Sequence, residues 1–423
     1  MTREMKNSGI PWIGEIPEGW TIELIGNQVK EVDNPNTNGE EDNALQFKMG
    51  SIISKSQGNS KYNPETLEGY NIVDKGVIML NGLNLSFDFI SQRVGLVRER
   101  GVITSTYLAV KPTDNIDSEY LTYLFKAYDN CKAFHSMGKG LRQTLSYGEL
   151  RKYLLIYPSL AEQQRIAEFL DRKCAEVDEM IALQEQIIEE LKAYKQSVIT
   201  EAVTKGLNPA APMRDSGIEW IGQIPEHWSK DKIIRSFRMI GSGTTPKSTD
   251  ENNFDGDINW IQSGDINGGV MESCKNRVSN ETIENCSALK VYSAPFIIVA
   301  MYGASVGNTS ISSIDGCVNQ ACCVLSDSAL NFNYAFSVIK SCKDYWLRKA
   351  VGGGQPNISQ ETIKQTWIPI PPITEQQAIA DYLDDKCADI DSLIQTKQSK
   401  IDSLKEYKKS IIYEYVTGKR EVE

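Results

Sequence analysis

One stretch of this sequence occurs twice. Residues 162–204 recur as residues 375–417 at a constant offset of 213, with 22 of 43 positions identical and no gap. Many other positions exchange side chains of similar shape, such as Val177 for Ile390. Loops drift in length after a duplication, so an uninterrupted match of this length predicts one rigid element that the chain uses twice.

Both copies have the pattern of a long helix. In the first copy the apolar residues fall at alternating steps of three and four, interrupted by Gln184 and Lys195; they are Ile166, Leu170, Cys174, Val177, Ile181, Ile188, Leu191, Val198 and Ala202. The second copy has the same stripe, formed by Ile379, Leu383, Cys387, Ile390, Ile394, Ile401, Leu404, Ile411 and Tyr415. A period near 3.5 with charges elsewhere is typical of a coiled-coil seam. Ser159 and Glu162 predict a capping box at the start of the first copy.

A lone helix of this kind would leave its apolar stripe in water, so the two copies most simply pack against each other. At 1.5 Å per residue, each copy is a rod of roughly 60 Å. The alternative is a core helix inside one ordinary domain, which fits poorly with the length of the segment and its duplication.

A second repeat sets the domain plan. The segment Ser8–Trp20 recurs as Ser216–Trp228 with 10 of 13 positions identical. Each half therefore consists of a short Trp/Pro-rich leading segment, a globular body of about 140 residues and a long helix. The predicted boundaries are 1–158 for the first leading segment and body, 159–206 for the first long helix, 207–371 for the second leading segment and body, and 372–423 for the second helix. We expect each leading segment to pack as an extended strap with its Trp side chains docked.

The two bodies, residues 20–158 and 228–371, both mix strands and helices. Residues 76–80, 107–110 and 295–300 have the pattern of strands, and residues 118–134 and 334–348 that of helices. The bodies match in these elements but differ through most of their sequence. This combination predicts one α/β scaffold that recognises two different things.

The distribution of charge leaves nucleic-acid binding open although the net charge is −11. Residues 159–206 carry 6 basic and 10 acidic side chains, and residues 372–423 carry 8 and 11. The bodies are close to neutral, with 15 basic against 16 acidic and 13 against 13. The long helices thus hold most of the excess, and the bodies are free to present basic faces.

No catalytic, metal or cofactor site is predicted. Only two histidines, His135 and His227, are present, so a histidine-based triad or metal site has little to work with. Residues 241–248 imitate a phosphate-binding loop, but Pro246 stands where a glycine is needed and removes an amide donor. The nine cysteines include no Cys-x-x-Cys pair and are expected to be reduced. The pattern favours a binding and scaffolding protein over an enzyme.

The chain is expected to be cytoplasmic and to have no membrane partner. Residues 1–7 lack the apolar core of a signal peptide, and the longest apolar run, 296–301, is too short to span a bilayer.

Over its whole length the chain resembles the DNA-specificity subunit of type I restriction-modification systems. The resemblance rests on Pro-x-x-x-Glu-Gln-Gln at the start of each long helix (158–164 and 371–377) and on the repeated Trp-Ile-Gly-x-Ile-Pro-Glu-x-Trp. The second body adds Gly-Thr-Thr-Pro at 243–246, Trp-Ile-Gln-Ser-Gly-Asp-Ile at 260–266, Tyr-Gly-Ala-Ser-Val-Gly at 302–307 and Val-Asn-Gln-Ala at 318–321. The first body lacks a clear Gly-Thr-Pro or Gly-Asp-Ile element.

The resemblance implies two α/β target-recognition domains in tandem, separated by two antiparallel coiled-coil helices in a pseudo-twofold repeat. Similar proteins read a split, asymmetric sequence on double-stranded DNA, one domain per half-site, with the helices setting the gap. Recognition domains on such rods could face half-sites near one turn of B-DNA apart, about 34–36 Å. The implied partners are two modification (methyltransferase) subunits and two restriction (translocase) subunits. The chain itself would be non-catalytic and hold no cofactor or metal.

The glycine-rich stretch ahead of the last strand of each body is our candidate for DNA contact, because glycine permits close backbone approach. Six residues carry this hypothesis: Lys139, Arg142 and Gln143 in the first body, Gln355 and Asn357 in the second, and Lys247 in the loop after residue 241. Basic groups would contact phosphates, and Arg or amide groups base edges.

Two alternative functions stay open at this point. The chain could be a coiled-coil scaffold or adaptor that does not contact DNA, or the specificity subunit of a modification-only complex in phage defence.

Overall fold

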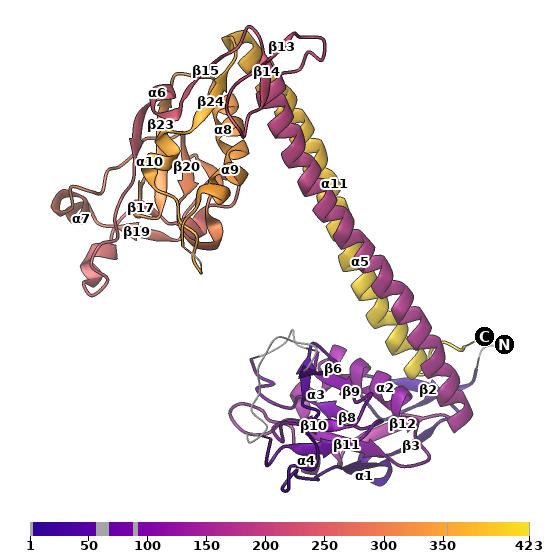
Figure 1. Cartoon of the computed structure of the whole chain (residues 1–423). Coiled ribbons are helices and arrows are strands. Elements are labelled where there is room, and N and C mark those ends of the chain that lie inside the picture. The colour runs from indigo at the N-terminus through magenta and orange to yellow at the C-terminus, as the bar shows by residue number, and fades with distance from the viewer. Residues whose placement is uncertain (1–2, 56–66, 88–91, 353, 423) are drawn as a thin grey trace. The chain divides into compact units, whose positions relative to one another are not determined.

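The computed structural model describes residues 3–55, 67–87, 92–352 and 354–422 (Figure 1). The chain forms two compact units: unit 1 is residues 1–185 with 398–423, and unit 2 is residues 186–397. The boundaries cut both of the longest helices, α5 (Leu160–Lys205) and α11 (Ile373–Val416). Each unit therefore contains one body and a part of each long helix.

Unit 1 contains short strands and helices before α5. The strands are β1 (Met5–Asn7), β2 (Glu15–Pro17), β3 (Thr21–Leu24), β4 (Val29–Glu31), β5 (Leu45–Lys48), β6 (Ser51–Ser54), β7 (Asn71–Val73), β8 (Ile78–Leu80), β9 (Val94–Leu96), β10 (Gly101–Ile103), β11 (Leu108–Pro112) and β12 (Leu154–Tyr157). The helices are α1 (Ile25–Gln28), α2 (Ser118–Asn130), α3 (Ala133–Met137) and α4 (Tyr147–Leu150).

A four-stranded sheet in the order β4-β11-β8-β9 is the centre of the first body. One face of this sheet, through Ile78, Leu80 and Val110, shares a core with α2 and α3. The other face, through Met79 and Ala109, packs in a separate apolar cluster. Alternate residues of a strand point to opposite faces, which explains why neighbours along β8 belong to different cores.

The end of the first body returns to its beginning, because β12 pairs antiparallel with β3. This pairing brings the start of α5 next to the leading segment. The leading segment is not the extended strap that we expected. Since its residues 8–14 turn back, with the Ser8 amide donating to the Gly14 carbonyl at 2.9 Å, β1 and β2 form an antiparallel hairpin. Its Trp12 packs edge-on against Tyr128, as docking predicts.

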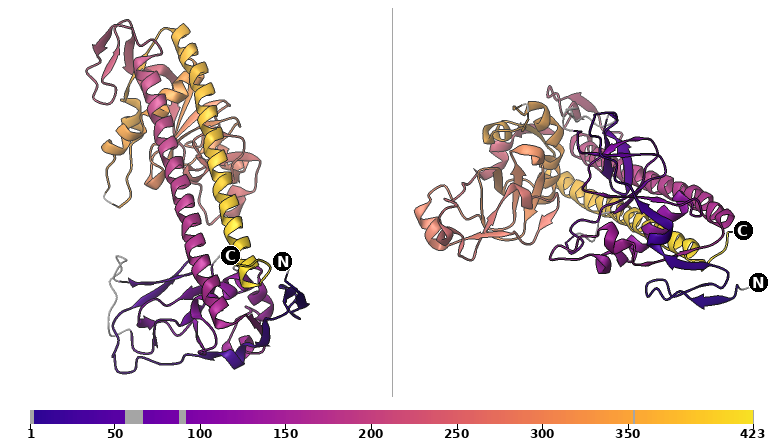
Figure 2. Two further views of the ribbon diagram at one scale, coloured as in Figure 1. Left: turned by 90° about the vertical axis from the view of Figure 1, so that its right-hand side faces the viewer. Right: turned by 90° about the horizontal axis from the view of Figure 1, so that it is seen from below.

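The two long helices pack together and run antiparallel, as expected, and they lie side by side in both views of Figure 2. In unit 1 the ring of Phe169 lies 4.4 Å from that of Tyr415, and Asp178 pairs with Lys408 at 2.6 Å. Residue numbers rise along α5 as they fall along α11. The start of α5 and the end of α11 both join the core of the first body.

Unit 2 repeats this plan. Its strands are β13 (Met213–Asp215), β14 (Gln223–Pro225), β15 (Ser229–Lys232), β16 (Phe237–Gly241), β17 (Ile258–Ile261), β18 (Val270–Met271), β19 (Asn276–Val278), β20 (Phe296–Ala300), β21 (Thr309–Ser312), β22 (Cys317–Val318), β23 (Cys322–Ser328) and β24 (Trp367–Ile370). Its helices, besides the parts of α5 and α11, are α6 (Ile233–Ser236), α7 (Asn280–Asn285), α8 (Phe332–Ser341), α9 (Lys343–Lys349) and α10 (Gln360–Lys364), with 3₁₀ helices η3 (Glu251–Phe254), η4 (Ser263–Asp265) and η5 (Gly303–Ser305).

The second body is built on a five-stranded sheet in the order β16-β23-β20-β21-β18, beside a three-stranded sheet β19-β17-β22. Its core takes in the start of α11, through Ile379 and Leu383, and the end of α5, through Ala202 and Val203. Lys195 of α5 pairs with Asp391 of α11 at 2.6 Å. These two residues are Lys408 and Asp178 displaced by 213, so the helix-to-helix contact of unit 1 recurs in unit 2.

The predicted seam is largely confirmed, with one correction. Near the end of α5 the fully buried positions are Ile199, Ala202 and Val203, whereas Val198 is half-buried. The buried stripe is displaced there because the second body packs against that flank. Gln184 is buried in the seam although it is polar.

The predicted capping box is half right. Ser159 Oγ accepts from the Glu162 amide at 3.4 Å, but the Glu162 carboxylate accepts from Arg3 at 2.8 Å. The predicted helix 118–134 is divided into α2 and α3 because Lys132 has a φ of 60°, and the predicted helix 334–348 is divided into α8 and α9. In the described part of the chain, no helix is long and apolar enough to cross a membrane.

Candidate nucleic-acid interface

In unit 1 the predicted contact stretch is a hairpin fastened to the end of β8. The Leu145 amide donates to the carbonyl of Gly82 at 2.9 Å, and the Leu85 amide donates to that of Gln143 at 3.2 Å. A Cβ added to Gly82 would lie 2.5 Å from the Leu145 oxygen, so this close approach requires glycine. The hairpin therefore has a rigid attachment to the sheet.

The hairpin presents its tip to solvent. Lys139 and Thr144 exchange two backbone hydrogen bonds, of 3.2 and 3.0 Å. Between them, Leu141 is 99% exposed and Arg142 is also exposed. Two positive φ angles, 83° at Gly140 and 43° at Gln143, turn the chain. An apolar and a cationic side chain side by side on a tight turn suit contact with a macromolecule.

The base of the hairpin carries a shared carboxylate. Glu149 Oε1 lies 3.0 Å from the ammonium of Lys139 and 3.0 Å from that of Lys152. Hydrogen bonds from Lys139 and Lys152 hold the pKa of the Glu149 carboxyl below its ordinary value, so it is ionised at neutral pH. Arg142 makes no ion pair or hydrogen bond among the described side chains, which leaves its guanidinium available.

A buried arginine supports the segment on which the hairpin rests. Arg93 is 1% exposed, and its Nη1 donates to the carbonyls of Asn81 at 2.8 Å and Leu83 at 2.7 Å. Its backbone N–H donates to Asp129 Oδ2 at 2.9 Å. Burial raises the pKa of the Asp129 carboxyl. Arg93 thus orders residues 81–83, which in turn contact the hairpin.

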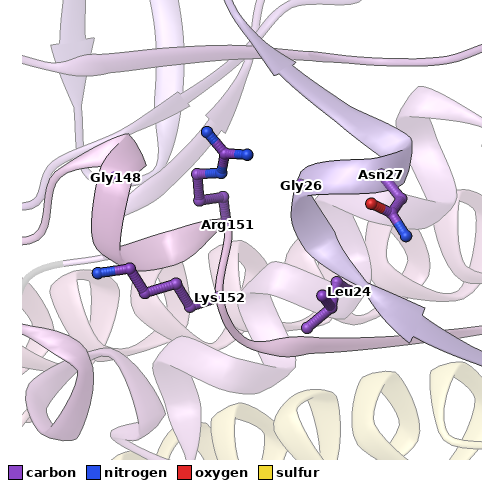
Figure 3. Close-up of a pocket in the computed structure, with 6 residues that line it drawn as sticks. All are labelled: Leu24, Gly26, Asn27, Gly148, Arg151 and Lys152. Carbon is purple, nitrogen blue, oxygen red and sulfur yellow. The ribbon is translucent and has the colours of Figure 1, made fainter.

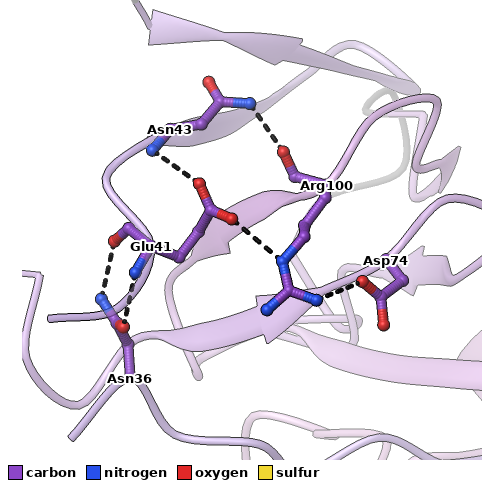
Figure 4. A network of polar contacts seen from close by, with 5 residues as sticks. All are labelled: Asn36, Glu41, Asn43, Asp74 and Arg100. Carbon is purple, nitrogen blue, oxygen red and sulfur yellow. Dashed lines mark hydrogen bonds and ion pairs between the residues drawn. The ribbon is translucent and has the colours of Figure 1, made fainter. Parts of the chain in front are cut away.

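A second polar network orders the loop after β4 (Figure 4). Asn36 and Glu41 exchange two hydrogen bonds, of 2.9 and 3.2 Å. Arg100 lies between the carboxylates of Glu41 at 3.0 Å and Asp74 at 2.8 Å, and its carbonyl accepts from Asn43 at 2.7 Å. Two carboxylates already satisfy the Arg100 charge, so this arginine is a structural residue.

In unit 2 the corresponding loops gather at one end of the sheets. Strand pairing places the end of β16 and the end of β20 beside the start of β23, through the pairs Gly241↔Val324 and Ala300↔Cys322. The parallel pair β17–β22 ends at Ile261↔Val318. The segments that follow these strands therefore meet at a common edge.

The motifs that carried the family resemblance contact one another there. A Cβ on Gly243 would lie 1.7 Å from the Val318 oxygen, so only glycine fits. Thr245 Oγ1 lies 2.6 Å from Gln320 Oε1, and the Asn319 amide donates to the Ile261 carbonyl at 3.0 Å. Segments separated in sequence by about 75 residues therefore form one surface.

The second predicted contact stretch joins the same surface. Asn357 exchanges two backbone hydrogen bonds with Val351, of 2.9 and 3.0 Å. The Gly303 amide donates to the Pro356 carbonyl at 2.8 Å, and the Ile358 amide to that of Met301 at 2.9 Å. This arrangement repeats in unit 2 the attachment of the first hairpin to the end of β8.

Two lysines brace the loops of unit 2 from α8 and α9. Lys340 Nζ donates to the Gly268 carbonyl at 3.0 Å, and Lys343 Nζ to Asn308 Oδ1 at 2.9 Å. Burial lowers the pKa of Lys340. Both cations act inside the body, so they are not candidates for phosphate contact.

The six predicted residues divide by exposure and by internal contacts. Arg142, Lys247 and Gln355 are exposed, and Lys139 is exposed but paired with Glu149. Gln143 and Asn357 are half-buried, and their backbones hold the hairpins together. The structure brings Gln355 and Asn357 into one hairpin and Lys139, Arg142 and Gln143 into the other. Lys247 lies beyond Gly243 in the loop that ends at Asp250, whose amide donates to the Lys247 carbonyl at 3.2 Å.

Sequence reasoning missed the supporting Arg93, because an isolated arginine in an irregular segment reads as a surface residue. It also missed Arg151 and Lys152, which belong to a basic stretch. Over residues 126–152 there are six basic and two acidic side chains, and one of the acidic pair, Asp129, is buried. That local excess was the available signal.

The described residues hold no group of three or more His, Cys, Asp or Glu side chains placed to bind a metal ion. The cysteines of the second body are core residues: burial raises the pKa of Cys317 and of Cys323 to about 12. Such thiols are protonated at neutral pH and are poor nucleophiles.

The family comparison and the comparison with individual relatives agree. The family described as "Type I restriction modification DNA specificity domain" matches residues 97–193 and 225–413, more than half of the chain. A protein assigned as the MjaX type I restriction enzyme specificity subunit of Methanocaldococcus jannaschii is 24% identical, over 96% of this chain and 95% of its own length. The EcoBI specificity subunit of Escherichia coli is 29% identical over 59% of this chain and 54% of its own length.

Two solved structures share the fold. A chain from a study of the complex assembly and conformational transition of the type I R-M system has a TM-score of 0.68 at 16% identity, covering 96% of this chain and 99% of that one. The HsdS subunit from Thermoanaerobacter tengcongensis has a TM-score of 0.50 at 16% identity, covering 96% and 98%.

Proposed function

This chain belongs to the DNA-specificity subunits of type I restriction-modification systems, and from that premise we propose that it reads a bipartite, asymmetric DNA target with one half-site per body. In such a system the specificity subunit sets the DNA target of the complex and is itself non-catalytic. A scaffold that does not contact DNA, the first alternative above, is therefore ruled out.

One observation carries the proposal of two half-sites: two unlike bodies are attached to the long helices by equivalent contacts. The pair Asp178–Lys408 recurs as Asp391–Lys195, and each body shares its core with the start of one long helix and the end of the other. The hairpins that these bodies present differ, with Lys and Arg in the first and Gln and Asn in the second. Because two unlike bodies are attached to the helices in the same way, we infer a target that has two different parts.

The proposed domain boundaries follow this division: recognition domains with their leading segments at 1–158 and 207–371, and spacer helices at 159–206 and 372–423. The helices are proposed to set the length of DNA between the half-sites.

We assign the direct contacts to the exposed residues of the two hairpins and of the loop after β16, together with the half-buried Asn357. Arg142 has the geometry for bidentate contact with guanine, and Gln355 and Asn357 for contact with adenine. Lys139 and Lys247 would contact phosphates, and Gln143 would act mainly by shaping its hairpin.

The long helices are the proposed docking surface for two methyltransferase subunits. Large apolar side chains remain exposed at equivalent positions on both helices, Met180 with Leu393 and Tyr194 with Tyr407. A duplicated surface implies two copies of the same partner, each bound once per repeat. Two restriction subunits would complete the assembly.

The proposal is tested by co-expressing the chain with its methyltransferase and mapping modified adenines across the host genome. We expect a two-part, non-palindromic motif. Replacing residues 228–371 with the body of a homologue should change one part of the motif and leave the other unchanged. A contiguous or palindromic motif, or a swap that alters both parts, would contradict the assignment of one half-site to each body. Adding the restriction subunit and measuring phage plating separates a restricting complex from a modification-only one.

A further inference from the structure

A shallow hollow on the first body lies between α1 and α4 (Figure 3). Its volume is about 480 Å³. The residues that line it are Leu24, Gly26, Asn27, Gly148, Arg151 and Lys152. In Figure 3 the Arg151 side chain stands between the two short helices, and the Lys152 side chain extends to the side of the helix that carries Gly148.

Backbone contacts hold the two walls of the hollow in place. The Ile25 amide donates to the Tyr153 carbonyl at 2.8 Å, and the Gly26 amide to that of Arg151 at 3.0 Å. A Cβ on Gly26 would lie 3.0 Å from the Arg151 Cβ, closer than side chains normally pack. The glycine therefore keeps α1 against the residues that follow α4, and the positions of the two cations follow from this contact.

The hollow has a surplus of positive charge. The Arg151 guanidinium lies over the Tyr147 ring at 5.9 Å and makes no ion pair among the described residues. Lys152 shares Glu149 Oε1 with Lys139. Two lysines therefore share one carboxylate, and Arg151 has no carboxylate partner among the described residues. Arg100, by contrast, is neutralised by two carboxylates of its own (Figure 4).

The acidic group on the other side of the hollow is already engaged. The Glu23 carboxylate accepts hydrogen bonds from Asn27 at 3.0 Å, Gln28 at 2.8 Å and Tyr157 at 2.9 Å. The Glu23 carboxylate is thus already hydrogen-bonded to residues of α1 and β12, and it makes no ion pair with Arg151 or Lys152.

The second body carries different residues at the equivalent positions. At the offset of 213, Gly148 corresponds to Glu361 and Arg151 to Lys364. Lys364 Nζ donates to Gln360 Oε1 at 3.1 Å, and Arg235 of α6 pairs with Asp231 at 3.1 Å. The cations there are satisfied internally, and a glutamate stands where the first body has glycine.

We propose that the hollow between α1 and α4 receives a phosphate group of the DNA backbone beside the first half-site, held by Arg151 and Lys152. This inference rests on the proposed function. Arginine and lysine without sufficient carboxylate partners are the usual ligands of phosphate oxygens. Lys139 links the hollow to the hairpin that carries Arg142, because it shares Glu149 with Lys152. One strand of a duplex can therefore meet the hairpin and the hollow together, which favours DNA over a free phosphate ion.

The test uses the full chain in complex with its methyltransferase and two duplexes, one with the mapped target and one without it. The double variant Arg151→Gln, Lys152→Gln removes the charge and keeps side-chain length. Gly148→Glu introduces the residue that the second body tolerates at this position, and the nearest atom to its Cβ is Ser146 Oγ at 3.7 Å. Affinity is measured by fluorescence anisotropy at several salt concentrations.

Both variants should weaken binding to the two duplexes by the same factor, roughly tenfold, because a phosphate contact carries no sequence information. For the double variant, the slope of log affinity against log salt should fall by about 1 to 2. The control is Lys75→Gln, Arg98→Gln, which removes two exposed cations beside β8 and β9, one of which, Arg98, pairs with Glu119. It should leave the slope within about 0.3 of that of the wild type.

Unchanged affinity and slope in the double variant would overturn the proposal, as would an equal loss in the control. A loss confined to the target duplex would also overturn it, because that result indicates base readout. If only the binding of inorganic phosphate, titrated alone, is lost, the hollow is a free-anion site and the DNA assignment is wrong. The preference of the wild-type complex for the target duplex, read in the same titrations, tests the proposed function independently.

Discussion

Replacing Arg93 with methionine should destabilise unit 1 strongly and disturb the first hairpin with it. The side chain is buried, and one guanidinium nitrogen satisfies the carbonyls of Asn81 and Leu83 at 2.8 and 2.7 Å. Methionine fills similar space but donates no hydrogen bond. Two half-buried carbonyls lose a charged donor, and each loss costs about 1–3 kcal/mol, so we expect a decrease of about 2–6 kcal/mol in the free energy of unfolding.

The assay is urea denaturation followed by circular dichroism, combined with hydrogen exchange of peptides covering β8, β9 and residues 138–145. Faster exchange should be confined to unit 1. Arg142→Met is the matched control: its guanidinium is exposed and makes no contact that stabilises the body, so its free energy of unfolding should change by less than about 0.5 kcal/mol. That control should still lose affinity for DNA.

The two variants together distinguish a residue that stabilises the body, Arg93, from a residue proposed to contact DNA, Arg142. A stability of Arg93→Met within about 0.5 kcal/mol of the wild type would refute the role that we assign to the buried guanidinium. Destabilisation by Arg142→Met would refute the reading of the hairpin tip as a free surface.

Three further predictions concern the cores. Gly418→Ala should cost about 2–4 kcal/mol in the free energy of unfolding, because φ is +70° and the new Cβ would lie 2.4 Å from Pro17 Cδ; a normal thermal melt would contradict this. Tyr292→Phe should be neutral or raise stability by up to about 1 kcal/mol, since the buried hydroxyl has no hydrogen-bond partner in the described structure; a loss above about 1 kcal/mol in urea denaturation would show that a partner exists. Iodoacetamide at pH 8 should alkylate the exposed Cys131 in the native protein. Cys323 should react only after unfolding, because burial raises its pKa to about 12. Peptide mass spectrometry shows the order of labelling, and early labelling of Cys323 would contradict its burial.

The candidate site shows where prediction from sequence reaches and where it stops. At the offset of 213, each body has a glycine-rich stretch ahead of its last strand. The structure has a hairpin at each of these two stretches. The offset did not separate Arg142, which is free, from Lys139, whose ammonium lies 3.0 Å from Glu149. That pairing depends on how α4 folds back beside the hairpin, and residue spacing carries no information on it.

The leading segment shows the same limit. Its Trp residues predicted docking, and Trp12 does pack against Tyr128. Its two-stranded form was not predicted, because β1 and β2 are each three residues long and their pairing gives no periodic signal.

By itself, the sequence determined the long helices, the duplication, the two-body plan and the family, since periodicity and internal repetition are local properties of the chain. Only the tertiary structure decided which flank of α5 is buried at Ile199 and Val203, which cations remain unpaired, and that Gly26 and Gly148 leave a hollow beside Arg151. These features arise from contacts between segments far apart in sequence, where the free energy depends on which atoms meet and not on residue type alone.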